Sequence, residues 1–286
     1  MGSGVSSAIL LLLATLAASQ TRWWQQPAVL APDTTAVDVQ EALEYKKVPG
    51  TVLRMDVYRP KHARSELLPA VVLVHGGPIP ADLPVEPRRI AQYTSLGRLV
   101  SSRGIAAVTF SHRLTSADAI DMAAHDVRDA VSFVVDHSAP LGIDAKCLCI
   151  WAISAGGVVI APAFREFGQR VRCLVLYYTL LDPAVFHSLV SPKTPPGVTA
   201  PGLTDLLIGG NLSLPATLIV RAGRDDAKLN EGLDRFTQAA MQRGADLELH
   251  AYASGRHGFD VFDDTPRSRE LLLRTLDFVR ESTVSR

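Results

Sequence analysis

Apolar and polar positions divide the chain from residue 52 onward into short strand-like runs and longer amphipathic stretches. Most of the short runs are continuous in valine, isoleucine and leucine, which is typical of strands covered on both faces by helices. The run at 52–58 alternates apolar and polar residues instead, and an edge strand at 37–45 would pair with it as an antiparallel start to the sheet. The predicted strands cover residues 52–58, 70–75, 106–111, 147–153, 171–178, 216–222 and 247–252.

Helical segments are predicted between these strands, at 88–102, 117–137, 155–167, 229–243 and 266–280. In the second segment one face is apolar at helical spacing. The residues of that face are Ile120, Ala123, Ala124, Val127, Ala130, Val131 and Val134. The alternation of strands and helices predicts right-handed crossovers and an α/β fold with one doubly wound, mainly parallel sheet.

Two stretches interrupt this alternation. Residues 77–87 are rich in proline and follow a predicted strand directly, and residues 187–215 are rich in Pro, Gly, Ser and Thr. A strand and a helix are normally joined by a much shorter link, and long loops in compact domains are often lids or binding loops. We therefore expect irregular loops at one end of the sheet, with 187–215 as a small lid-like insertion in a single domain over 20–286.

Composition and charge narrow the classes of partner. The chain has 286 residues, 47% of them hydrophobic and 20% charged, which suits a globular protein with a large core. The formal net charge is zero and the charges are scattered, so we expect neither nucleic acid nor an anionic membrane surface as a partner. The histidines lack metal-site spacing and no C-x-x-C or H-E-x-x-H motif occurs, so no metal is expected.

The first residues predict a secretory signal peptide over 1–19. Residues 8–18 are almost wholly apolar but too short to span a bilayer comfortably, and Ala17 and Ser19 are small residues at suitable spacing for cleavage. The segment before residue 8 lacks Lys and Arg, so an uncleaved anchor and a misassigned start remain as alternatives. The prediction implies a secreted or periplasmic protein with no stable membrane span in the mature chain.

The three cysteines are an odd set, so at least one thiol is unpaired. Cys147, Cys149 and Cys173 all lie in apolar, strand-like runs, where free thiols act as small hydrophobic residues. We expect buried free thiols, with a Cys149–Cys173 or a Cys147–Cys173 bridge as the alternatives.

Chemically versatile residues follow four of the predicted strands. In open α/β sheets ligands bind at the carboxyl ends of the strands, so these four segments would meet at one edge. The segments are His75-Gly76-Gly77-Pro78, Ser154-Ala155-Gly156-Gly157, Gly223-Arg224-Asp225-Asp226 and Gly255-Arg256-His257-Gly258-Phe259. A nucleophile, a carboxylate and a histidine thus occur in the chain order found on the α/β-hydrolase fold.

Ser154 would be the nucleophile of this set. A serine hydroxyl attacks well only when a neighbouring base removes its proton, and His257 is the candidate base. A sharp strand-to-helix turn would present the hydroxyl, and such a crowded turn needs very small neighbours, as Ala152 and Gly156 are.

An oxyanion hole is predicted from backbone N–H groups next to this turn. The N–H of Ala155 and one or both of those of Gly76 and Gly77 would stabilise the negative charge of a tetrahedral intermediate. Pro78 has no N–H and cannot contribute. We expect His75 to shape this loop, and His112, His125 and His137 to be packing or surface residues.

Five short motifs resemble those of α/β-hydrolase-fold serine esterases, in particular the hormone-sensitive-lipase-like and small secreted carboxylesterase groups. They are H-G-G at 75–77, F-S-H-R-L at 110–114, S-A-G-G at 154–157, A-G-R-D at 222–225 and H-G-F at 257–259. The resemblance covers residues 52–280. The chain departs from the family pattern at Ala152, where glycine is usual, at His112, where tyrosine is favoured, and at Pro78, where a third glycine is common.

The resemblance implies a carboxylesterase that cleaves small to medium esters without a cofactor, through a Ser-His-Asp triad and an acyl-enzyme intermediate. In relatives with A-G-x-D the acid is the residue corresponding to Asp225, whereas other hydrolases would use Asp226 or Asp182. A peptidase related to prolyl oligopeptidase and a non-catalytic binding protein with the same fold are the alternative functions. The sequence leaves the oligomeric state open.

Overall fold

The structure of the protein is a computed structural model that describes residues 22–32, 35–63, 65–194 and 200–284. Eight strands of the described residues form one sheet in the order β1-β2-β4-β3-β5-β6-β7-β8. Strand β1 is antiparallel to β2 and β2 to β4, and the other neighbours are parallel. The strands are β1 (Val37–Val48), β2 (Thr51–Pro60), β3 (Leu68–Val74), β4 (Ala106–Phe110), β5 (Ile143–Ile153), β6 (Val171–Tyr177), β7 (Ala216–Ala222) and β8 (Leu247–Tyr252). The predicted fold class, a mainly parallel sheet with an antiparallel start, is confirmed.

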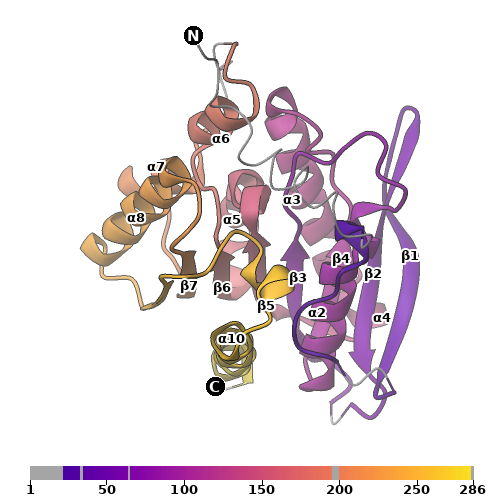
Figure 1. The fold of residues 1–286 in the computed structure, drawn as a ribbon. Helices are drawn as coiled ribbons and strands as arrows, with labels where there is room; N and C mark the ends of the chain where they lie inside the picture. The colour runs from indigo at the N-terminus through magenta and orange to yellow at the C-terminus, as the bar shows by residue number, and fades with distance from the viewer. Residues whose placement is uncertain (1–21, 33–34, 64, 195–199, 285–286) are drawn as a thin grey trace.

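Helices cover both faces of the sheet (Figure 1). The α-helices are α2 (Ala91–Ser102), α3 (Ile120–Asp136), α4 (Ser138–Leu141), α5 (Ala161–Phe167), α6 (Pro183–Val190), α7 (Leu203–Ile208), α8 (Ala227–Gln242), α9 (Phe259–Phe262) and α10 (Pro266–Val284). Short 3-10 helices are η2 (Trp23–Gln25), η3 (Pro87–Arg89), η4 (Ala117–Ala119), η5 (Ser154–Val159) and η6 (Gly168–Arg170). Helices α3, α5 and α8 pack on one face of the sheet, and α2 and α10 pack on the other.

Alternation along the central strands supplies both layers of the core. In β3, Val72 and Val74 belong to the hydrophobic cluster beneath α3 and α5, whereas Val71 and Leu73 belong to the cluster beneath α2 and α10. Because both faces are buried, the strand reads as a continuous apolar run. The apolar face predicted for 117–137 is fully buried in α3, as expected.

Two predicted segments differ from the structure. The stretch 187–215 was expected to be irregular, but α6 reaches Val190 and α7 lies within it, because Phe186, Leu203 and Leu207 are buried in the core. Residues 195–199 of this stretch lie outside the described residues. The helix predicted at 155–167 is divided into η5 and α5, because Pro162 lies in the first turn of α5, where proline is tolerated, and would disrupt a helix interior.

Two of the three cysteines form a disulfide, so the expectation of free thiols was wrong for them. The register of β5 and β6 pairs Cys149 directly with Cys173, with their Cα atoms 4.6 Å apart, and the two are bonded. Strand register is a tertiary property that the spacing of cysteines does not reveal. Cys147 is a half-buried free thiol, as predicted.

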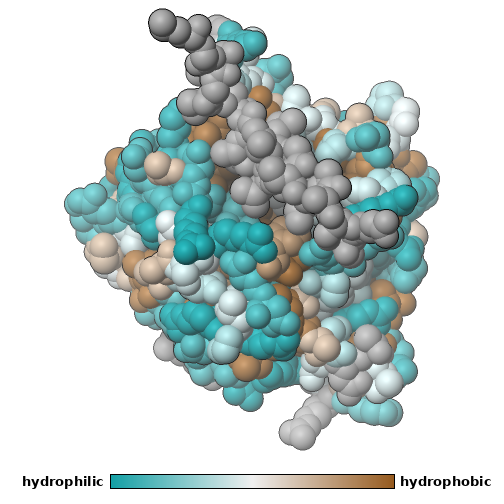
Figure 2. Space-filling view, in the orientation of Figure 1, coloured by the Kyte–Doolittle hydropathy of each residue, from teal (hydrophilic) through white to brown (hydrophobic). Residues whose placement is uncertain are grey.

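Two further features bear on the environment of the protein. The face of the molecule in Figure 2 is mostly hydrophilic, with hydrophobic residues in small groups between polar ones. Among the described residues, no helix is long and apolar enough to cross a membrane. The predicted signal peptide over 1–19 lies outside the described residues.

Candidate active site

Ser154 occupies a sharp turn directly after β5 and is the first residue of η5. Its φ of 54° lies in the left-handed region, which non-glycine residues seldom adopt. The turn presses against neighbouring backbone, since a Cβ on Gly156 would lie 2.6 Å from the carbonyl oxygen of Val74. A Cβ on Gly157 would lie 2.1 Å from Cγ2 of Thr179. Only glycine fits at 156 and 157, which explains the small residues after Ser154.

Three side chains from separate strand ends are joined by short polar contacts. Oγ of Ser154 lies 2.7 Å from Nε2 of His257, and Nδ1 of His257 lies 2.7 Å from Oδ2 of Asp225. The Asp225 side chain is only 3% exposed and that of His257 is 21% exposed. A carboxylate at this position holds the proton on Nδ1, which leaves Nε2 free to accept the proton of Ser154.

The two alternative acids have other contacts. Oδ1 of Asp226 accepts the backbone N–H of Lys228 and caps α8. Oδ1 of Asp182 accepts the N–H of Ala184 and caps α6, and its other oxygen faces Arg235 at 3.5 Å. The structure therefore brings Asp225 to the histidine and uses the other two carboxylates at helix starts.

The loop after β3 lies against Ser154 and differs in part from the predicted oxyanion hole. The N–H of Gly76 donates to Oη of Tyr93, 2.9 Å away, so this donor is already occupied. Within the part of the chain that the structure describes, no acceptor is recorded for the N–H of Gly77. Ala155, directly after Ser154, is fully buried. The backbone donors that remain for an oxyanion are those of Gly77 and Ala155.

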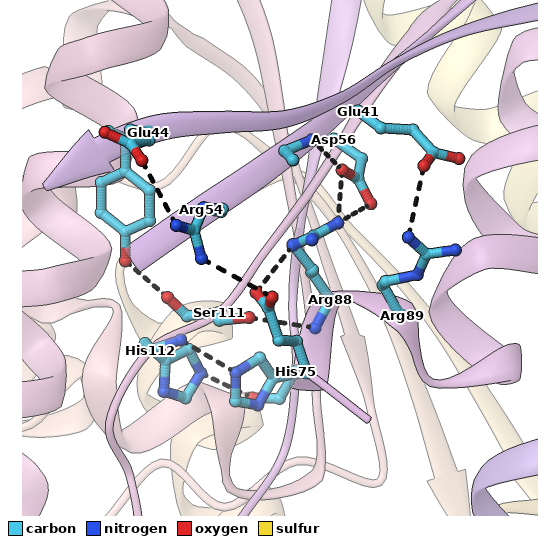
Figure 3. Close-up of polar contacts among 12 residues, drawn as sticks. Glu41, Glu44, Arg54, Asp56, His75, Arg88, Arg89, Ser111 and His112 are labelled. Atoms are coloured by element: carbon cyan, nitrogen blue, oxygen red, sulfur yellow. Dashed lines mark hydrogen bonds and ion pairs between the residues drawn. The ribbon is translucent and has the colours of Figure 1, made fainter. Parts of the chain in front are cut away.

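His75 and His112 form a stacked pair below this loop, with ring centroids 3.5 Å apart (Figure 3). The N–H of His112 donates to Nε2 of His75, and the other nitrogen of His75, Nδ1, lies 2.7 Å from the carbonyl oxygen of Gly76. Burial lowers the pKa of both imidazoles, that of His112 to about 4, so the pair is neutral at pH 7. His75 thus shapes the loop, as expected, and His112 packs against it. His125 and His137 lie at the surface, also as expected.

A second polar group beside His257 was not predicted. The Tyr178 ring meets that of His257 edge to face, with centroids 4.6 Å apart. Oη of Tyr178 donates to Oδ1 of Asp260, and Nε2 of Gln92 donates to Oδ2. Burial raises the pKa of the Asp260 carboxyl. The sequence carried one signal for this group, since Tyr178 is the last residue of a predicted strand and Asp260 follows the H-G-F motif.

A cavity of about 300 Å³ opens above Ser154. Its walls come from the loop after β3, from the start of α2 and from residues 257–262. Trp23, Ile79 and Phe262 give these walls a largely apolar character. Groups of three or more potential metal-ligating side chains do not occur among the described residues. The cavity can hold a small, mainly apolar molecule against the Ser154 hydroxyl.

Comparison with known proteins extends these observations. A family model described as BD-FAE matches residues 55–161, which include the loop after β3 and Ser154. A search of curated proteins found no match. A bacterial heroin esterase has a similar structure, with a TM-score of 0.68 and 17% identity over 98% of this chain and 91% of that chain.

Two further solved structures have comparable similarity. An esterase from Pyrobaculum calidifontis has a TM-score of 0.66 and 20% identity over 98% of this chain and 91% of that chain. A truncated carbohydrate esterase from gut microbiota has a TM-score of 0.67 and 18% identity over 91% of this chain and all of that chain. At such identities the likeness shows a shared fold, the α/β-hydrolase fold that the motifs indicated.

Proposed function

We propose that the chain is a serine hydrolase, specifically a carboxylesterase that cleaves small to medium esters through an acyl-enzyme intermediate. The observation that carries the proposal is the hydrogen-bonded series Ser154–His257–Asp225 at the base of a cavity. A serine, a histidine and a buried carboxylate without a shared function would not be expected to align in this way. The cavity volume of about 300 Å³ suits an ester of modest size.

The first half of the reaction forms the acyl-enzyme. Oγ of Ser154 attacks the ester carbonyl carbon while its proton passes to Nε2 of His257. The carbonyl oxygen becomes an oxyanion, which the N–H groups of Gly77 and Ala155 stabilise. The buried carboxylate of Asp225 stabilises the imidazolium. When the intermediate collapses, the bond to the alcohol breaks and His257 gives its proton to the leaving oxygen.

The second half restores the enzyme by the same route. A water molecule replaces the alcohol, His257 accepts one of its protons, and the resulting oxygen attacks the acyl carbon. A second oxyanion forms on the same backbone donors. Its collapse breaks the bond to Oγ of Ser154, which recovers its proton from His257, and the carboxylic acid leaves.

Replacement of Ser154 tests the proposal. Ser154→Ala should abolish hydrolysis of p-nitrophenyl acetate and labelling by a fluorophosphonate, while its urea unfolding matches that of the unsubstituted chain. Ser188→Ala is the matched control, because within the described part of the chain the Ser188 hydroxyl bonds to the carbonyl of Val185 in the same helix, α6. Undiminished turnover in Ser154→Ala would refute the proposal.

A panel of substrates then distinguishes the alternatives. Esters of graded acyl length, with feruloyl and acetyl-sugar members, would define the substrate class. Cleavage of peptides in preference to all esters would favour the peptidase alternative. Absence of both fluorophosphonate labelling and turnover in the unsubstituted chain would favour a binding protein.

We also propose that the protein is exported and cleaved after residue 19. The Cys149–Cys173 disulfide supports this location, since disulfides persist mainly in oxidising compartments. Sequencing the amino terminus of the protein from its native host would test the proposal. A chain retained in the cytosol with residue 1 intact would contradict it.

A further inference from the structure

A tyrosine hydroxyl accepts a hydrogen bond from one of the backbone N–H groups that were expected to bind the oxyanion. Tyr93 is the third residue of α2, and its Oη accepts the N–H of Gly76 at 2.9 Å. The residue is 6% exposed, and it lines the same cavity as Ser154. Tyr93 therefore contacts the loop after β3 and also borders the cavity.

The Tyr93 hydroxyl retains its own proton for another partner. A phenol can donate one hydrogen bond as well as accept, and here its oxygen is the acceptor. Among the described residues, no carbonyl, carboxylate or hydroxyl is recorded as accepting the Tyr93 proton. Burial raises the pKa of the phenol, which keeps this proton in place at neutral pH. A buried donor without a protein acceptor on a cavity wall is available to whatever fills the cavity.

Gly76, whose N–H is bonded to the Tyr93 hydroxyl, lies directly against Ser154. A Cβ built on Gly76 would lie 3.0 Å from Cβ and 3.4 Å from Oγ of Ser154. The Tyr93 oxygen is one hydrogen bond away from the Gly76 nitrogen. Pro78, two residues further on, has no N–H to donate. The loop therefore offers the reacting carbonyl one backbone donor, at Gly77, and α2 offers one side-chain donor, at Tyr93.

We propose that the Tyr93 hydroxyl is a catalytic residue that donates a hydrogen bond to the oxyanion of each tetrahedral intermediate, together with the N–H groups of Gly77 and Ala155. The inference rests on the proposed function and adds a residue to it. The N–H of Gly76 acts through Tyr93, because donation to the phenol oxygen polarises its O–H and strengthens it as a donor. The phenol stays protonated throughout, so no proton or electron changes place at this residue.

Tyr93→Phe is the first test. Loss of one oxyanion donor lowers kcat by about 10²- to 10³-fold in comparable enzymes, and KM should change little because the charge develops only in the intermediate. Tyr177→Phe is the matched control, since its buried hydroxyl bonds to Thr275 Oγ1 of α10 at 2.6 Å and Tyr177 does not line the cavity. The control should keep its kcat within about twofold. Unchanged kcat in Tyr93→Phe would overturn the inference.

A fluorinated tyrosine separates donation to the oxyanion from simple support of the loop. 3-Fluorotyrosine at position 93 keeps the hydroxyl but makes it a stronger donor and a weaker acceptor. As an oxyanion donor it should keep or raise kcat relative to Tyr93, whereas a residue that only accepts the N–H of Gly76 would lose activity. A fall in kcat with 3-fluorotyrosine would overturn the inference. Failure of the proposed function is distinguishable, since the unsubstituted chain would then show no Ser154-dependent turnover.

Discussion

Replacing Asp225 by asparagine is the sharpest test of which acid supports the histidine. Oδ1 of Asp225 accepts the N–H of Asp226 at 2.8 Å, and Oδ2 faces Nδ1 of His257 at 2.7 Å. In Asp225→Asn the side-chain carbonyl would keep the first contact, because only an acceptor suits that N–H. The amide NH₂ would then face Nδ1 and require it to be the acceptor.

The inverted amide changes the tautomer of His257. With Nδ1 as an acceptor, the ring proton moves to Nε2, which points at Oγ of Ser154 and can no longer take its proton. The same substitution in a serine protease triad lowers kcat by about 10⁴-fold, which corresponds to about 5.5 kcal/mol at 1.36 kcal/mol for each factor of ten. We expect a loss of about that size here.

The neighbouring carboxylates provide matched controls. Asp226 and Asp182 cap α8 and α6, and asparagine caps a helix about as well as aspartate. Asp226→Asn and Asp182→Asn should therefore keep kcat/KM within about twofold and alter the free energy of unfolding by less than about 0.5 kcal/mol.

Initial rates with p-nitrophenyl acetate at pH 8 measure the three variants side by side, and urea unfolding confirms that each is folded. The assignment fails if Asp225→Asn stays within tenfold of the unsubstituted chain. It fails equally if either control loses most of its activity, because another carboxylate would then support His257.

Three further predictions concern stability. Arg88→Met leaves the buried carboxylate of Asp56 without its partner and should cost about 3–5 kcal/mol in urea unfolding (Figure 3), and a loss below 1 kcal/mol would contradict a buried ion pair. Replacing both Cys149 and Cys173 by alanine removes a cross-link between residues 24 apart and should lower the free energy of unfolding by about 3 kcal/mol. Equal stability of the unsubstituted chain with and without reductant would contradict this prediction. Burial lowers the pKa of His112 to about 4, so below pH 6.5 this imidazole is protonated in the unfolded chain but stays neutral in the folded chain. As the pH is lowered from 6.5 to 4, protonation of this group in the unfolded chain should reduce the free energy of unfolding by up to about 1.4 kcal/mol per pH unit, and above pH 6.5 it should have no effect. The free energy of unfolding is measured by urea titration at each pH. An unchanged pH slope in a His112→Gln variant would refute this prediction.

The sheet and the chemical segments at its edge could be predicted because they depend on local patterns. A strand buried on both faces is apolar throughout, and a parallel sheet brings all its carboxyl ends to one edge. These two facts place Ser154 and His257 in the same region without knowledge of any contact. The burial of β3 on both faces agrees with the continuous run at 70–75.

The remaining features depend on contacts that a local pattern does not record. The disulfide follows from the register of β5 and β6, and the Gly76–Tyr93 bond joins a loop to a helix 17 residues away. Helices α6 and α7 form in a stretch rich in helix-breaking residues because their apolar side chains enter the core. The start of the following helix is a local feature that distinguishes Asp225 from Asp226. The predicted helix started at 229, whereas a start at 227 makes Asp226 the cap and leaves Asp225 free to face the histidine.

Backbone hydrogen bonds connect three neighbouring strand ends at the site. Ser154 and Tyr178, which both have positive φ, follow the neighbouring strands β5 and β6. The N–H of Leu180 donates to the carbonyl of Ser154, and the N–H of Tyr178 donates to that of Val220 in β7. The strained turn that carries Ser154 is therefore tied through β6 to the strand that leads to Asp225. If Ser154 and Asp225 act as proposed, such ties would hold the hydroxyl and the carboxylate in place before a substrate arrives, so that little reorganisation is needed when charge develops.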